Sequence, residues 1–203
     1  TFRGKGDPWP HLYLTQRISP SGGHLGPDAP SLADLSRLDF GIRVRLLFDR
    51  RNATSGHDPR LHAAQFVFFL TIQNLNRASP GHGDYFWFGV MLYDDRYPVT
   101  SLKAQLDAGS PKKPATGKLI YDIGVKPFTE RVVAAGEWVD VHGDLLPHVI
   151  VGLNEAWRRG YLGDSKNLSD YRVGSAVLGW EITGLNDAAM AVRNLRCQAR
   201  TKQ

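Results

Sequence analysis

The sequence has a single cysteine, Cys197, and no long apolar stretch. One cysteine cannot form a disulfide within the chain, so packing and hydrogen bonds must hold the fold together. The longest uninterrupted apolar run, Phe66 to Leu70, has five residues, whereas a membrane-spanning helix needs about 20. The sequence therefore predicts neither a disulfide-bonded scaffold nor a membrane-spanning helix.

Motifs for nucleotides and for common hydrolases are also lacking. There is no Gly-x-x-x-x-Gly-Lys-Ser/Thr phosphate loop, no dinucleotide fingerprint and no Gly-x-Ser-x-Gly elbow, which argues against nucleotide-dependent and serine-hydrolase chemistry. The histidines have no metal-ligand spacing, so we expect no transition metal. We predict no cofactor, with one alternative left open: a structural calcium ion held by loop oxygens, for example those of Asp94, Asp95 or Asp187.

The chain is basic, with 25 Lys and Arg against 20 Asp and Glu and a net charge of +5 over 203 residues. The basic residues occur as scattered short pairs, such as Arg50–Arg51 and Arg158–Arg159, and not as one stripe. Because nucleic-acid sites usually cluster their charge on one element, we do not expect a nucleic-acid partner. A basic surface would suit an acidic polysaccharide.

The length predicts one domain. Residues 1–38 are rich in Pro and Gly and read as an extended lead-in that packs on a body formed by residues 39–203. Within the body, apolar residues alternate with other residues along Asp39–Arg50, Ala64–Asn74 and Tyr85–Tyr93, the period typical of strands with two different faces. Further strands are expected at 12–17, 118–123, 137–141, 171–182 and 188–198, the last two paired as a closing hairpin.

One segment has the period of a helix. After Asp144, apolar residues recur every three or four positions, and Arg158 to Gly160 supply C-terminal cations and a terminating glycine. This pattern predicts one amphipathic helix over 144–159, with Asp144 as its N-cap, packed across a sheet or closing an open end. Many strands, one helix and no alternating strand–helix rhythm predict an antiparallel β-sandwich of jelly-roll type.

The non-core faces of the strands combine planar polar groups with aromatic rings. Such groups suit glycans, because Arg, Gln and Glu bind hydroxyl groups while the C–H face of a sugar stacks on Trp or Tyr. The predicted ligand-binding residues are Trp87, Tyr85, Tyr93, Arg43, Arg45, Gln65, Gln73 and Glu181. The alternatives left open are a second small core of Tyr85, Trp87 and Met91 under the helix or the lead-in, and a face that is half covered and half cleft.

This pattern over residues 39–198 resembles the lectin-like and carbohydrate-active jelly rolls of the concanavalin-like type, which use a concave sheet face for their ligands. The resemblance is architectural, because neither the Glu-x-Asp-x-x-Glu strand of laminarinase-like hydrolases nor the Arg-x-Glu-x-Arg and Gln-x-His signatures of jelly-roll alginate lyases is present.

Three functions follow as expectations. The first is a secreted or cell-surface carbohydrate-binding protein that uses the polar and aromatic face around Trp87. The second is a glycan-cleaving enzyme, a glycoside hydrolase or polysaccharide lyase, in the same cleft, with Glu181 and Tyr85 as its catalytic residues. The third is a structural or interaction jelly roll in which the helix buries the aromatic residues. The sequence leaves the oligomeric state open.

Overall fold

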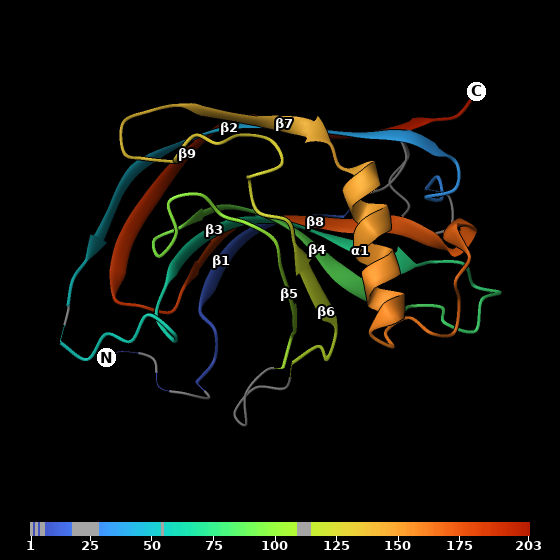
Figure 1. The fold of residues 1–203 in the computed structure, drawn as a ribbon, viewed down its shortest axis with the longest axis horizontal. Helices are drawn as coiled ribbons and strands as arrows, with labels where there is room; N and C mark the ends of the chain where they lie inside the picture. Colours follow the sequence, from blue (N-terminus) through green and yellow to red (C-terminus); the bar gives the residue numbers. More distant parts are fainter. Residues whose placement is uncertain (1, 3, 5–6, 18–28, 54, 109–114) are drawn as a thin grey trace.

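In a computed structural model, which describes residues 2, 4, 7–17, 29–53, 55–108 and 115–203, the chain is a sandwich of two β-sheets with one α-helix (Figure 1). Sheet A has six strands in the order β1 (His11–Arg17), β8 (Tyr171–Ile182), β3 (Ala64–Asn74), β4 (Tyr85–Asp94), β6 (Leu119–Asp122) and β5 (Lys103–Leu106). Sheet B has three, in the order β7 (Val139–Asp144), β2 (Leu35–Arg51) and β9 (Asn186–Thr201). The jelly-roll sandwich expected from the sequence is confirmed.

All strand pairs are antiparallel except β4 and β6, which run parallel. The core lies between the two sheets and takes one parity from each strand. Phe40, Ile42 and Val44 come from β2, while Phe68 and Leu70 come from β3, and all are at most 2% exposed. The period-two pattern of the sequence is therefore the inward face of each sheet.

The closing hairpin expected from the last two strands is wrong. β8 lies in sheet A between β1 and β3, whereas β9 pairs with β2 in sheet B, so residues 183–185 carry the chain from one sheet to the other. The alternation along the two strands is the same whether they pair in one sheet or lie in different sheets. It therefore does not predict which sheet each strand joins.

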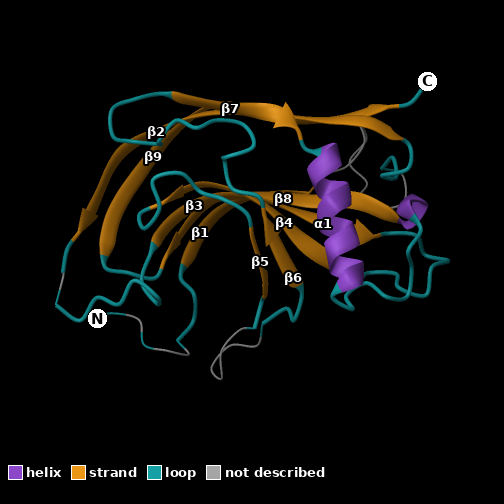
Figure 2. Ribbon diagram, in the orientation of Figure 1, coloured by secondary structure: helices purple, strands orange, loops and turns teal. Residues whose placement is uncertain are grey.

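Helix α1 (Leu146–Arg158) stands at one end of the sandwich beside β4 (Figure 2). It buries Val149, Leu153 and Ala156, so it closes the open end of the core. Asp144 is not the N-cap, which is Leu145, but its carboxylate accepts hydrogen bonds from the backbone N–H groups of Leu38 and Leu146. A short 3₁₀ helix, Leu168–Asp170, precedes β8. No helix in the described part of the chain is long and apolar enough to span a membrane.

Candidate functional site

The outer face of sheet A lies on the inner side of the bend of the sandwich (Figure 1), and we call it the hollow face. It carries the side chains that alternate with the core residues of β3, β4 and β8. The strand register places five of the predicted site residues along it: Gln65, Gln73, Tyr85, Trp87 and Glu181.

Apolar side chains fill the middle of the hollow face. Val67, Phe69, Met91 and Val177 form a buried cluster, and Phe69 lies over Gly89, where an added Cβ would approach Cε1 of Phe69 to 2.6 Å. Three further residues, Tyr13, Trp87 and Ile120, pack partly buried against this cluster. The middle of the face is thus partly buried, and Tyr13 of β1, the edge strand beside β8, takes part in this packing. Helix α1 packs on the core side of the sheet instead.

Glu181 lies at one end of the hollow face, where it pairs across the strands with Gln65 of β3 and His11 of β1. The hydroxyl of Tyr13 donates a hydrogen bond to Glu181 Oε1. Burial raises the pKa of the Glu181 carboxyl, although the hydrogen bond from Tyr13 lowers it. A carboxyl whose neutral form is favoured is a candidate proton donor.

Asp122 lies in the middle of the hollow face, at the end of β6. Its Oδ1 accepts hydrogen bonds from the backbone N–H groups of Met91, at 3.0 Å, and Gly124, at 2.8 Å. Burial raises the pKa of Asp122 to about 6, and the charge of Glu181 adds to this effect. Asp122 does not stand out in the sequence, because its strand is only four residues long and has no clear alternation.

A third carboxylate, that of Asp107, follows β5 at the opposite edge of sheet A from β1. Its negative charge raises the pKa of Glu181, after the larger effect of burial, and it also raises that of Tyr13. Asp107 and Glu181 thus belong to strands on opposite sides of the hollow face, β5 and β8. Asp107 is partly exposed, and its Oδ2 accepts hydrogen bonds from the backbone N–H and the hydroxyl of Thr116.

The aromatic residues predicted to hold a ligand lie at the far end of the hollow face. Tyr85 meets Trp87 edge-on, with ring centroids 5.5 Å apart, and Trp87 is partly buried. Since Glu181 pairs with Gln65 and Tyr85 with Gln73, eight residues of β3 separate them, which is about 26 Å at the usual rise of a strand. Glu181 and Tyr85 are therefore far apart along the strand direction, and their shared catalytic role stays a prediction.

Tyr93 does not lie on the hollow face. Leu92 is an extra residue in β4, because Phe66 pairs with Tyr93 while Val67 pairs with Met91. This bulge turns Tyr93 toward the core, where its ring packs on Trp180 at 6.0 Å and its hydroxyl donates to Asp49 Oδ2 of sheet B at 2.8 Å. The alternation that placed Tyr93 with Tyr85 holds only up to the bulge.

Arg43 and Arg45 are also elsewhere. They belong to β2, so their side chains leave sheet B on its outer face and stack against Trp138, with guanidinium carbons 5.8 and 4.9 Å from the ring centroid. The outer faces of the two sheets of a sandwich point in opposite directions. The prediction that Arg43 and Arg45 share a ligand-binding face with residues of β3 and β4 is therefore wrong.

Two predicted binding residues already have partners within the protein. Gln65 is 5% exposed, and its Nε2 donates to Asp94 Oδ2 at 2.7 Å, while Gln73 Nε2 donates to the carbonyl oxygen of Gly83. Asp94 also forms an ion pair with Arg96 in the turn after β4. The carboxylate of Asp95 accepts hydrogen bonds from Arg51 and from the backbone of Ala64.

Within the described ranges, no three His, Cys, Asp or Glu side chains gather in a group that could hold a metal ion. The calcium ion considered from the sequence gains no support from this arrangement. Burial raises the pKa of the Cys197 thiol to about 12, so this cysteine is a poor nucleophile at neutral pH.

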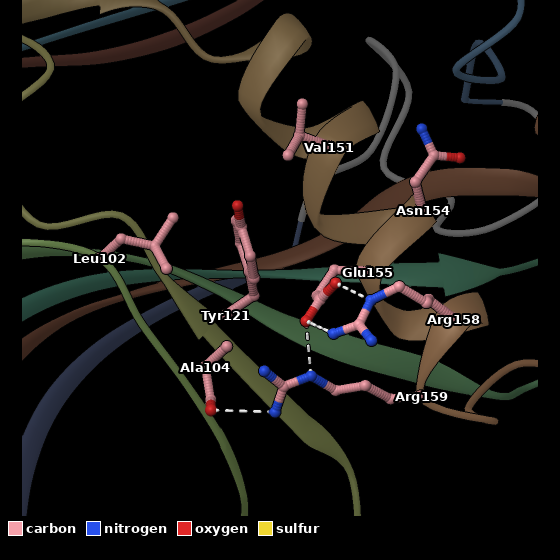
Figure 3. A pocket seen from close by; sticks show the side chains of 8 residues that line it. All are labelled: Leu102, Ala104, Tyr121, Val151, Asn154, Glu155, Arg158 and Arg159. Atoms are coloured by element: carbon pink, nitrogen blue, oxygen red, sulfur yellow. Dashed lines mark hydrogen bonds and ion pairs between the residues drawn. The ribbon is translucent and has the colours of Figure 1, made fainter.

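A separate pocket of about 400 Å³ lies on the other side of the sheet, between α1 and β5 (Figure 3). Apolar groups of Leu102, Tyr121 and Val151 line it, and at its rim Glu155 is held by Arg158 and Arg159. These hydrogen bonds lower the pKa of Glu155 to about 2. A carboxylate held so firmly in its ionised form is a poor proton donor, and the hollow face remains the better candidate for an active site.

No protein-family model and no curated protein sequence matches the chain. Several solved structures do match the chain. A thermostable cellulase derived from Cel12A of Rhodothermus marinus is 11% identical, with a TM-score of 0.51 over 98% of this chain and 79% of that one. A metagenome-derived endoglucanase of glycoside hydrolase family 12 is 13% identical, with a TM-score of 0.50 over 100% of this chain and 79% of that one. At this identity the likeness establishes the fold, a concanavalin-like β-jelly roll.

Proposed function

We propose that the chain is a glycan-cleaving enzyme, a glycoside hydrolase that binds a polysaccharide along the hollow face and protonates the glycosidic oxygen with Glu181. The observation that carries the proposal is the Glu181 carboxyl, whose neutral form is favoured by burial and which is held by the Tyr13 hydroxyl. The endoglucanases that share the fold support it. The glycan-cleaving alternative of the sequence analysis thus takes precedence over the carbohydrate-binding protein.

Glycoside hydrolysis needs one protonated carboxyl and one ionised carboxylate on either side of the bond. Two carboxylates interact with Glu181, those of Asp107 and Asp122. Asp122 is buried and committed to two backbone N–H groups, so its role is structural. Asp107 is partly exposed on the opposite edge of the sheet, where a sugar or a water molecule can reach it. We therefore assign the second carboxylate to Asp107.

The far end of the hollow face supports a long substrate. Trp87 pairs with Thr71 and Glu181 with Gln65, so six residues of β3 separate the aromatic pair from the proton donor, about 20 Å along the strand. Sugar rings stack on such aromatic faces. A glycan that contacts Trp87 and reaches Glu181 spans several sugar units, which favours a polymer cleaved internally. Since such polymers lie outside cells, we propose a secreted or cell-surface protein.

The test is the release of reducing ends from neutral and acidic polysaccharides, with affinity electrophoresis in gels of the same polymers. Glu181→Gln and Asp107→Asn should lower kcat at least about 100-fold, the usual contribution of acid–base catalysis, and leave retardation in the gels unchanged. Glu137→Gln, at an exposed site outside the hollow face, is the matched control and should keep full activity.

Other outcomes identify the other two functions. Retardation that is lost in Trp87→Ala, with no product from the unmodified chain, would show a carbohydrate-binding protein without catalysis. No retardation in any gel and no product would leave a structural or interaction role. Full activity in both Glu181→Gln and Asp107→Asn would contradict the assignment of these two carboxylates even if the chain cleaves glycans.

A further inference from the structure

The outer face of sheet B, on the opposite side of the molecule from the hollow face, is rich in arginine. Because alternate residues of β2 point into the core, those between them point outward. The register places arginines of β9 beside them, since Arg43 pairs with Arg193 and Arg37 with Arg200. Six arginines share this face, which we call the arginine face: Arg37, Arg43, Arg45, Arg193, Arg196 and Arg200.

A bulge in β9 brings two of these side chains to the same face. Arg193 and Arg196 are three positions apart, so regular alternation would point them in opposite directions. The register shifts at this point, between the Gly41 and Arg43 pairs of β2, and Asn194 adopts a left-handed φ of 54°. The extra residue turns both arginines outward, in the way that bulges re-aim side chains.

The position beside Arg196 on β2 is a glycine. A Cβ added to Gly41 would lie 2.8 Å from Nε of Arg196, so the Arg196 side chain lies over this glycine. Next to it, Trp138 packs against three arginines, and the guanidinium carbon of Arg193 is 4.5 Å from its ring centroid. Stacking of this kind holds the cations in fixed positions on the sheet.

The carboxylates of this face balance only part of its charge. Asp39 accepts hydrogen bonds from Arg37 and Arg200, and Asp140 forms an ion pair with Arg43 at 2.8 Å. Among the described residues, Arg45, Arg193 and Arg196 have no carboxylate partner. Nε of Arg45 is buried without a hydrogen-bond partner. A face with surplus fixed guanidinium groups and an unsatisfied donor is suited to anions.

We propose that the arginine face binds an acidic polysaccharide through the carboxylate or sulfate groups of its sugars. All of the surplus cations are arginines, whose planar fork matches such groups in two-point contacts. Neighbouring strands place the cations in rows about 4.8 Å apart, so a chain of regularly spaced anions can engage several at once. The site is distinct from the hollow face and does not require catalysis there.

Nucleic acid fits this face less well. A single nucleic-acid strand needs exposed aromatic rings on which its bases can stack. The ring of Trp138 is instead already stacked with guanidinium groups.

The test measures retardation in gels of polygalacturonate, dextran sulfate and a neutral cellulose derivative, at several salt concentrations. The double variant Arg193→Gln/Arg196→Gln should bind both acidic polymers at least fivefold more weakly, with a shallower salt dependence and an unchanged melting temperature. The matched control is Arg77→Gln/Lys166→Gln, which removes the same charge from exposed sites outside this face, and it should bind as the unmodified chain does.

Three results would overturn the proposal. One is the absence of retardation by either acidic polymer at low salt. Another is equal weakening in the two double variants, which would show that net charge alone is responsible. The third is tighter binding of a DNA duplex than of either acidic polysaccharide at the same salt concentration.

Discussion

At the scale of single residues, Asp122 is a buried carboxyl whose neutral form is favoured by that burial. Its pKa is raised to about 6, above the value of 3.8 expected in the unfolded chain. The folded state therefore binds the proton more tightly. This contribution to stability is fully present below pH 3.8 and is lost as the pH rises through about 6.

Asp122→Asn should remove this dependence, because an amide oxygen can still accept the hydrogen bonds from Met91 and Gly124. Relative to the variant, the unmodified chain should lose on the order of 2–3 kcal/mol of unfolding free energy between pH 4 and pH 7, as a shift of about two pKa units implies. Urea unfolding at each pH measures the difference. Asp187→Asn, at an exposed site, is the control, and an equal pH dependence in both variants would contradict the role of Asp122.

The individual residues also show where sequence patterns stop being informative. Alternation placed Trp87, Gln65 and Glu181 on the hollow face, because β3, β4 and β8 each keep their period over long runs. It misplaced Tyr93, because one extra residue in β4 reverses the parity beyond it. Nothing in the sequence marks the contact between Tyr13 and Glu181, which are 168 positions apart and meet only through the pairing of β1 with β8.

At the scale of elements, the strands and the helix lie within a few residues of their predicted positions, since hydrophobic period determines which segments have a core face. β5 (Lys103–Leu106) was not predicted, because four residues at a sheet edge show no clear period. The assignment of strands to sheets could not be predicted either. Arg43 and Arg45 belong to a well-predicted strand, but only the pairing of β2 with β7 and β9 shows that they face away from Trp87.

Helix α1 docks on the sandwich through a glycine. A Cβ at Gly152 would lie 2.8 Å from Cδ1 of Tyr121 and 3.2 Å from Cε2 of Phe86, so the helix lies close to the sheet. Gly152→Ala gains about 1 kcal/mol of helix propensity but overpacks this contact, which costs about 1–3 kcal/mol. We expect net destabilisation by about 1 kcal/mol, measured by urea unfolding. Asn154→Ala on the exposed side of the helix should not destabilise the chain, and a stabilised Gly152→Ala variant would contradict the close contact.

At the scale of the whole molecule, the sandwich presents two outer faces of different chemistry. The hollow face combines buried carboxyl groups with an aromatic pair, and the arginine face carries surplus positive charge. The charge of Asp107, which follows β5, raises the pKa of Glu181 on β8, after the larger effect of burial.

This coupling can be measured without any assumption about activity. The negative charge of Asp107 raises the pKa of Glu181, so Asp107→Asn should lower that pKa, whereas Glu137→Gln should leave it unchanged. Carbon-13 NMR of the side-chain carboxyl groups reports the titration, with Glu181→Gln identifying the signal. Added salt should weaken the effect if solvent lies between the two groups. An unchanged Glu181 pKa in Asp107→Asn would show that the edges of the sheet are too far apart for the two carboxylates to share one substrate.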